Sequence, residues 1–181
     1  MEKLALGAVQ LGLPYGAANE TGMPSIESAT AIVRVAVDSA IPFIDTAAIY
    51  GESEERIGAA FAALGVAGQP EQPTVVTKVD MEKIVDPDAT AEGVVAAVDA
   101  SVAQSLERLR TGSLDVLLLH SFLGYSQVHD GAAWKRLVEL RDDGVGELPI
   151  PYAPHPAPPR FHPAGSLQRP GWACRATRRR R

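Results

Sequence analysis

The sequence predicts an α/β protein with a parallel sheet, made of about four strand–helix units of a (β/α)8 barrel of the TIM-barrel type. Short apolar runs alternate along the chain with longer amphipathic segments, as in a parallel sheet with helical crossovers. Successive runs end at polar residues, as barrel strands do around an active site. An open doubly wound sheet is the alternative, but the first run lacks the G-x-G-x-x-G turn that would favour it.

The first two units extend to Gly65. Residues 4–9 predict the first strand, and a loop rich in glycine and proline follows. Ser25 is placed to cap the first helix, and residues 43–45 predict the second strand. Ser53 is placed to cap the second helix, which has acidic residues in its first turn and Gly65 at its end.

The next two units repeat this pattern. Residues 74–77 predict a third strand, Thr90 is placed to cap a long third helix, and residues 115–119 predict a fourth strand before a helix over 132–143. The apolar positions predicted to face the core are Ala29, Ile32, Val33, Ala36 and Val37 on the first helix, Ile57, Ala60, Phe61 and Leu64 on the second, Val94, Val95, Val98, Val102, Leu106 and Leu109 on the third, and Trp134, Leu137, Val138 and Leu140 on the fourth.

Composition indicates a soluble protein. The 181 residues suit one domain, and the apolar fraction of 46% with 22% charged residues is ordinary for a globular chain. No apolar run approaches the roughly 18 residues needed to cross a bilayer, so no membrane partner is predicted. The single cysteine, Cys174, excludes an intrachain disulfide, and the predicted location is the cytoplasm.

The charge changes sign near the end of the chain. Residues 1–148 hold 10 Lys and Arg against 22 Asp and Glu, a net charge of −12, whereas residues 149–181 hold 7 Arg and no acid, a net of +7, and 8 of the 14 prolines. We therefore predict a half-barrel over 1–146 and a disordered tail over 147–181. The arginines at the chain end are interpreted as part of that tail, so no nucleic-acid partner is predicted.

Four polar side chains follow the predicted strands. Asp45 and Lys78 end the second and third strands, His120 follows the fourth, and Tyr50 lies in the loop after Asp45. Each alone has an ordinary explanation, such as a loop-fixing acid, a packed aromatic, a solvated strand end or a core histidine. Together, an acid, a phenol, an amine and an imidazole at one rim of the sheet form a set that a catalytic site uses and that side-chain packing does not need. No metal site is predicted.

The chain resembles the aldo-keto reductases over about residues 4–144. The matching segments are Leu6–Gly12, Phe43–Ala47 with Tyr50–Glu54, Thr77–Lys78, Ser105–Leu109 and Leu117–His120. The resemblance implies a TIM barrel in which Asp45, Tyr50, Lys78 and His120 form a catalytic tetrad and NADPH is the cofactor. It further implies reduction of an aldehyde or ketone, or the reverse oxidation of a sugar-like alcohol, with the tyrosine as general acid.

The chemistry of these side chains suits that reaction. Carbonyl reduction builds negative charge on oxygen, so the site needs a proton donor. A cation about 4 Å away stabilises a phenolate by roughly 4 kcal/mol at an effective dielectric constant near 20, which predicts a pKa for Tyr50 lowered by Lys78 to about 7. Asp45 would orient Lys78, and neutral His120 would position the carbonyl oxygen.

The chain departs from the family after its fourth unit. A barrel of this type takes about 250 residues and eight units, but here proline occupies the positions of a fifth strand after residue 146. We expect the family's main cofactor contacts to belong to the later half, so residues that bind NADPH are unassigned. The alternative function is a truncated, non-catalytic fragment that self-associates through the unpaired first and fourth strands.

Overall fold

A computed structural model of the chain describes residues 4–80, 88–120 and 128–147. These residues belong to one compact unit, Met1–Pro149. The predicted tail, residues 147–181, lies outside the described residues apart from Glu147. No helix in the described ranges combines the length and the apolar character needed to cross a membrane.

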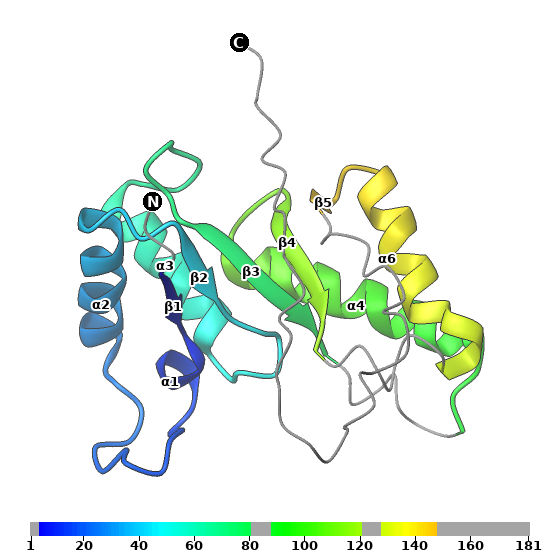
Figure 1. The fold of residues 1–181 in the computed structure, drawn as a ribbon, viewed down its shortest axis with the longest axis horizontal. Helices are drawn as coiled ribbons and strands as arrows, with labels where there is room; N and C mark the ends of the chain where they lie inside the picture. Colours follow the sequence, from blue (N-terminus) through cyan, green and yellow to red (C-terminus); the bar gives the residue numbers. More distant parts are fainter. Residues whose placement is uncertain (1–3, 81–87, 121–127, 148–181) are drawn as a thin grey trace, which may run out of the picture. The chain divides into compact units, whose positions relative to one another are not determined.

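The described residues form a parallel sheet whose strands lie side by side in chain order (Figure 1). The strands are β1 (Ala5–Gly7), β2 (Phe43–Asp45), β3 (Thr74–Val79), β4 (Leu114–Leu119) and β5 (Gly146–Glu147). A doubly wound sheet reverses its strand order at a switch point, whereas a barrel keeps it sequential. The observed order therefore confirms the predicted barrel type and excludes the open-sheet alternative.

The fifth strand corrects one expectation. Leu114 and Val116 of β4 pair with Gly146 and Glu147 of β5, so β4 is not the free edge that the sequence predicted. The two residues of β5 supply the start of a fifth strand just before the prolines begin. Within the described residues, β1 pairs on one side only, with β2.

Four long helices pack against one face of the sheet. They are α2 (Ile26–Asp38), α3 (Ser53–Leu64), α4 (Ala91–Leu109) and α6 (Ala132–Asp142), and consecutive helices contact one another. Burial alternates along β3, where Val75, Thr77 and Val79 are buried and the residues between them are half-buried. This period of two indicates that the helices cover the face of Thr77, while the opposite face carries Lys78.

The predicted helix signals at three termini are confirmed. The Ser25 side chain accepts a hydrogen bond from the Ser28 amide at the start of α2, and Thr90 does the same for the Gly93 amide of α4. Gly65 ends α3 in the left-handed conformation, at φ 69°. Each signal depends on local hydrogen bonding or backbone freedom, which is why the sequence alone predicts it.

Three local predictions are wrong. The first strand ends at Gly7, and Val9 begins a short helix, α1 (Val9–Gly12). Ser53 lies inside α3 rather than at its cap, because its buried hydroxyl donates to the Ala8 carbonyl at 2.8 Å instead. Ile32 of α2 was predicted to face the core but is 39% exposed, and it lines a hollow together with Leu6 of β1.

Most of the predicted core positions are buried. Val94 and Val98 of α4, Ile57 of α3 and Leu137 of α6 are fully buried. Others that the spacing predicted, such as Leu64, Val95 and Leu106, are partly buried against this core.

Helices α3 and α4 approach closely at Gly58. A Cβ atom there would lie 2.5 Å from the Arg108 carbonyl oxygen and 2.8 Å from the carbonyl carbon of Leu109. Both are backbone atoms that cannot rotate away. We predict that Gly58→Ala lowers the free energy of unfolding by about 1–3 kcal/mol, measured by urea denaturation.

Gly93→Ala is the matched control within a helix. Its Cβ would make only an ordinary contact with Thr90 Oγ1 at 3.4 Å, so no loss of stability is expected. Equal stabilities of the two alanine variants would contradict the close α3–α4 contact.

Candidate active site

The four candidate residues lie at the carboxyl ends of neighbouring strands. Asp45 is the last residue of β2, Lys78 is the penultimate residue of β3, and His120 directly follows β4. Tyr50 lies in the loop between β2 and α3. Parallel pairing in register, with Asp45 opposite Val76, places these ends at one rim of the sheet.

Lys78 is the centre of the group. Its Nζ donates to Asp45 Oδ1 at 2.8 Å and to the Thr46 carbonyl oxygen at 2.8 Å. Its side chain is only 14% exposed, whereas that of Asp45 is 44% exposed. A mostly buried ammonium needs such partners, because leaving water costs free energy that an ion pair and a hydrogen bond offset.

Tyr50 lies between Lys78 and His120. Lys78 Nζ is 5.4 Å from the centroid of the tyrosine ring, a cation–π distance. The Tyr50 and His120 rings pack edge to face, with centroids 5.7 Å apart and planes at 88°. His120 Nδ1 is buried and makes no hydrogen bond to the described part of the chain. The structure thus brings together all four residues that the sequence singled out.

The loop that carries Tyr50 is fixed by residues that sequence reasoning missed. Thr46 Oγ1 donates to Ser53 Oγ at 2.9 Å, which joins the two ends of the loop, and the Ala48 amide donates to the Lys78 carbonyl oxygen at 3.0 Å. Gly12 lies so close to the backbone of this loop that a Cβ on it would collide with the Tyr50 carbonyl oxygen. The glycine and the two hydroxyl residues are individually common in loops, so only the fold reveals their role.

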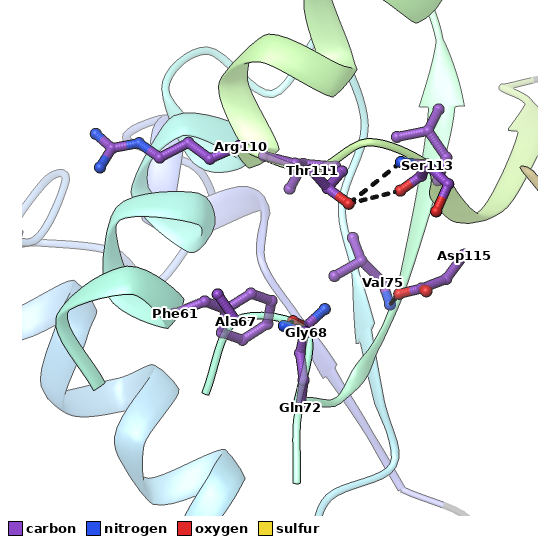
Figure 2. Close-up of a pocket in the computed structure, with 11 residues that line it drawn as sticks. Phe61, Ala67, Gly68, Gln72, Val75, Arg110, Thr111, Ser113 and Asp115 are labelled. Atoms are coloured by element: carbon purple, nitrogen blue, oxygen red, sulfur yellow. Dashed lines mark hydrogen bonds between the residues drawn. The ribbon is translucent and has the colours of Figure 1, made fainter. Parts of the chain in front are cut away.

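A small cavity lies at the amino ends of β3 and β4, away from the four candidate residues (Figure 2). Its lining includes Phe61, Val75 and Thr111, and its volume of about 50 Å³ admits a few waters but neither a nicotinamide nor a sugar. Asp115 at its edge accepts a hydrogen bond from the Val75 amide at 2.8 Å. We conclude that the residues around this cavity hold β3 and β4 together and do not form a ligand site. No group of His, Cys, Asp or Glu in the described ranges could hold a metal ion.

The family of the chain follows from a comparison with family models. The model described as "Aldo/keto reductase family" matches residues 3–145, well over half of the chain. The chain belongs to the aldo/keto reductase family. The match confirms the resemblance that the sequence motifs indicated.

Solved structures of aldo-keto reductases share this fold. One from Pseudomonas aeruginosa is 30% identical, with a TM-score of 0.60, and the match covers 80% of this chain and 54% of that one. One from Bombyx mori in complex with NADP is 25% identical, with a TM-score of 0.56, covering 80% of this chain and 45% of that one. This aldo/keto reductase chain therefore spans about half the length of the structures it matches. No curated protein matches it significantly.

The electrostatics of this aldo/keto reductase site differ from expectation at Tyr50. Burial raises the pKa of the Tyr50 phenol above its ordinary value of 10, and the negative charge of Asp45 raises it further. The sequence predicted a pKa lowered by Lys78. That prediction is wrong for this chain because burial of the phenol, with the negative charge of Asp45 beside it, disfavours the phenolate.

The pKa of His120 is lowered in the folded chain. Burial lowers the pKa of the His120 imidazole below 6.5, the nearby charge of Lys78 lowers it further, and Asp45 opposes the shift. The ring is therefore neutral at pH 7, as the sequence interpretation required.

The His120 shift predicts a pH dependence of stability. In the unfolded chain this histidine becomes protonated below pH 6.5, whereas in the folded chain it stays neutral to a lower pH. The free energy of unfolding should therefore fall as the pH drops from 6.5 towards about 5, above the main range of carboxylate protonation. NMR titration of the His120 ring should give a midpoint below 6.5.

One variant isolates the contribution of His120 in this experiment. His120→Asn should flatten the stability profile in this window, because asparagine does not titrate there. A His120 midpoint above 6.5 would contradict the assigned environment.

Proposed function

We propose that the chain carries the proton-donating part of an NADPH-dependent aldehyde or ketone reductase, with Tyr50 as general acid. The contact of Tyr50 with both Lys78 and His120, at the carboxyl ends of successive strands, is the observation that supports it most. Membership of the aldo/keto reductase family supports the same reaction class. The substrate proposed is a small carbonyl compound or a related sugar-like alcohol.

The donor set fits a nicotinamide cofactor. Hydride addition to a carbonyl leaves negative charge on oxygen, and the site offers a phenol, an ammonium and a neutral imidazole. NADP in the Bombyx mori aldo-keto reductase supports this choice of cofactor. When bound, NADPH would supply the hydride that reduces the carbonyl carbon. Asp45, Tyr50, Lys78 and His120 would lie at its reacting end.

Each residue of the set has a distinct role in this proposal. Tyr50 keeps its proton at neutral pH, because its pKa is raised, and gives it to the carbonyl oxygen during reduction. Neutral His120 donates a hydrogen bond that positions this oxygen. Lys78, held by Asp45, stabilises the tyrosinate that remains, and solvent returns the proton.

Turnover of a reactive aldehyde tests the proposal. Loss of NADPH absorbance should follow aldehyde addition, and Tyr50→Phe and Lys78→Met should each lower the rate by about 100-fold or more, since they remove the proton donor or the charge that stabilises its anion. Lys135→Met is the matched lysine control, because Lys135 lies on the surface of α6 and pairs with Asp130. Turnover that survives in Tyr50→Phe would exclude this mechanism.

The alternative is a non-catalytic chain that associates with a second copy of itself. Among the described residues β1 is an unpaired edge, and two apolar side chains, Leu4 directly before β1 and Val35 on α2, are 60% and 61% exposed. A hollow of about 870 Å³ flanks this edge, lined by Leu6, Ile32 and the loop before α2. The unpaired edge of β1 leaves backbone groups open to a further strand, which a second copy of the chain could supply.

Light scattering across a concentration series separates these two functions. Self-association predicts dimers or larger species, which Leu4→Glu and Val35→Glu should reduce by placing charge in the contact. Ala63→Glu, on the exposed face of α3, is the control and should not change the mass. A wild-type chain that is monomeric at every concentration would exclude association, and a chain without turnover or NADPH fluorescence binding would exclude the reductase.

A further inference from the structure

Glu54 is a buried carboxylate that the proposed reaction does not use. It lies in the first turn of α3, four residues after Tyr50, and is 1% exposed. A carboxylate rarely occupies such a position unless it is paired, because its removal from water costs free energy. Its neighbour Glu55 is also in the first turn, so the helix start does not depend on Glu54 for negative charge.

The contacts of Glu54 lead to both sides of the candidate site. Its Oε1 accepts a hydrogen bond from Thr77 Oγ1 at 2.6 Å, and Thr77 directly precedes Lys78 on β3. Its Oε2 lies 3.6 Å from Arg108 Nη1 and has no hydrogen bond within the described residues. Glu54 therefore interacts with the neighbours of the candidate catalytic residues rather than with their side chains.

Arg108 extends this chain of contacts to the Tyr50 loop. Its Nη1 donates to the Ala48 carbonyl oxygen at 3.1 Å. Ala48 is held on its other side by the hydrogen bond from its amide to the Lys78 carbonyl oxygen at 3.0 Å. The peptide groups that flank Ala48, two residues before Tyr50, are thus fixed between α4 and β3.

We propose that Glu54 and Arg108 form a positioning pair that holds the Tyr50 loop against the end of β3. The proposal rests on the function proposed above, since it assigns the pair to the placement of the general acid. The Glu54 carboxylate orients the Arg108 guanidinium, and Arg108 holds the loop through its hydrogen bond to the Ala48 carbonyl oxygen. Neither residue touches the reacting groups, so both are positioning residues and not catalytic ones.

Charge, and not shape alone, is what the pair contributes in this proposal. Buried ion pairs can often be replaced by neutral residues of similar volume without loss of stability, so stability alone does not require them. A planar guanidinium can donate to the Ala48 carbonyl while it faces the carboxylate, which the smaller lysine ammonium does less well. Thr77 occupies one oxygen of Glu54, which leaves the other oriented towards Arg108.

The titration of Tyr50 tests the pair without any need for turnover. Phenolate absorbance of the full chain, minus that of Tyr50→Phe, gives the Tyr50 midpoint. In Arg108→Met the loosened loop should expose the phenol, so its pKa should fall from the raised value towards 10. Loss of the arginine charge alone would do the opposite, because removal of a cation raises a phenol's pKa.

Two conservative variants distinguish positioning from packing. Glu54→Gln keeps the size and the acceptor for Thr77 but loses the charge, and it should shift the Ala48 and Lys78 amide NMR signals. These amide signals are its readout, because loss of a carboxylate charge lowers a phenol's pKa whether or not the loop moves. Arg108→Lys should lower the Tyr50 midpoint by less than Arg108→Met does, which rescues part of the effect. If Arg108→Met does not fold, these two variants decide the question.

Arg136→Met is the matched control. Arg136 is a partly buried arginine that pairs with Asp99 and Glu139 away from the site, so its loss should lower stability but leave the Tyr50 midpoint unchanged. A Tyr50 midpoint in the Arg108 variants that stays as in this control, or that rises, would overturn the proposal, as would Ala48 and Lys78 amide signals that are unchanged in Glu54→Gln. Absence of carbonyl reduction would count against the proposed function alone, because the phenol titrates with or without turnover.

Discussion

The ammonium of Lys78 is the group on which the rest of the site depends. It is mostly buried, and its partners are the carboxylate of Asp45 and the carbonyl oxygen of Thr46, both at the end of the neighbouring strand. A single cation therefore ties the carboxyl ends of β2 and β3 together and fixes the point where the Tyr50 loop departs. The loop's further attachments, through Ser53 and Ala48, act on a chain segment whose start is already held.

The positions of the four candidate residues could be predicted because they follow from strand order. Parallel strands bring their carboxyl ends to one edge, so Asp45, Lys78 and His120 are neighbours as soon as their strands are recognised. The caps at Ser25 and Thr90 were equally predictable, because each satisfies amides within its own first turn.

Other features could not be predicted, because they depend on groups far apart in the sequence. Ser53 has the residue type of a helix cap, yet its hydroxyl binds Ala8, 45 residues earlier in the chain. The acidic residues after it lie in the first turn of α3 as predicted, but the hydrogen bond that Glu54 accepts from Thr77 on β3 has no local signal. The rise of the Tyr50 pKa depends on how deeply the phenol is buried and on how close Asp45 lies to it. None of these distances is encoded in a local pattern.

The sequential order of the strands also bears on how the unit forms. Every strand pairs with the next one along the chain, and each long helix packs against its predecessor, so no contact between these elements must wait for a distant segment. Each parallel pairing still spans a helix and its loops, so a sheet of this kind folds more slowly than a helical bundle does. During synthesis, each new strand emerging from the ribosome can add to an existing edge. The acid–base residues would then be assembled once β4 is in place, before any later part of the polypeptide is made.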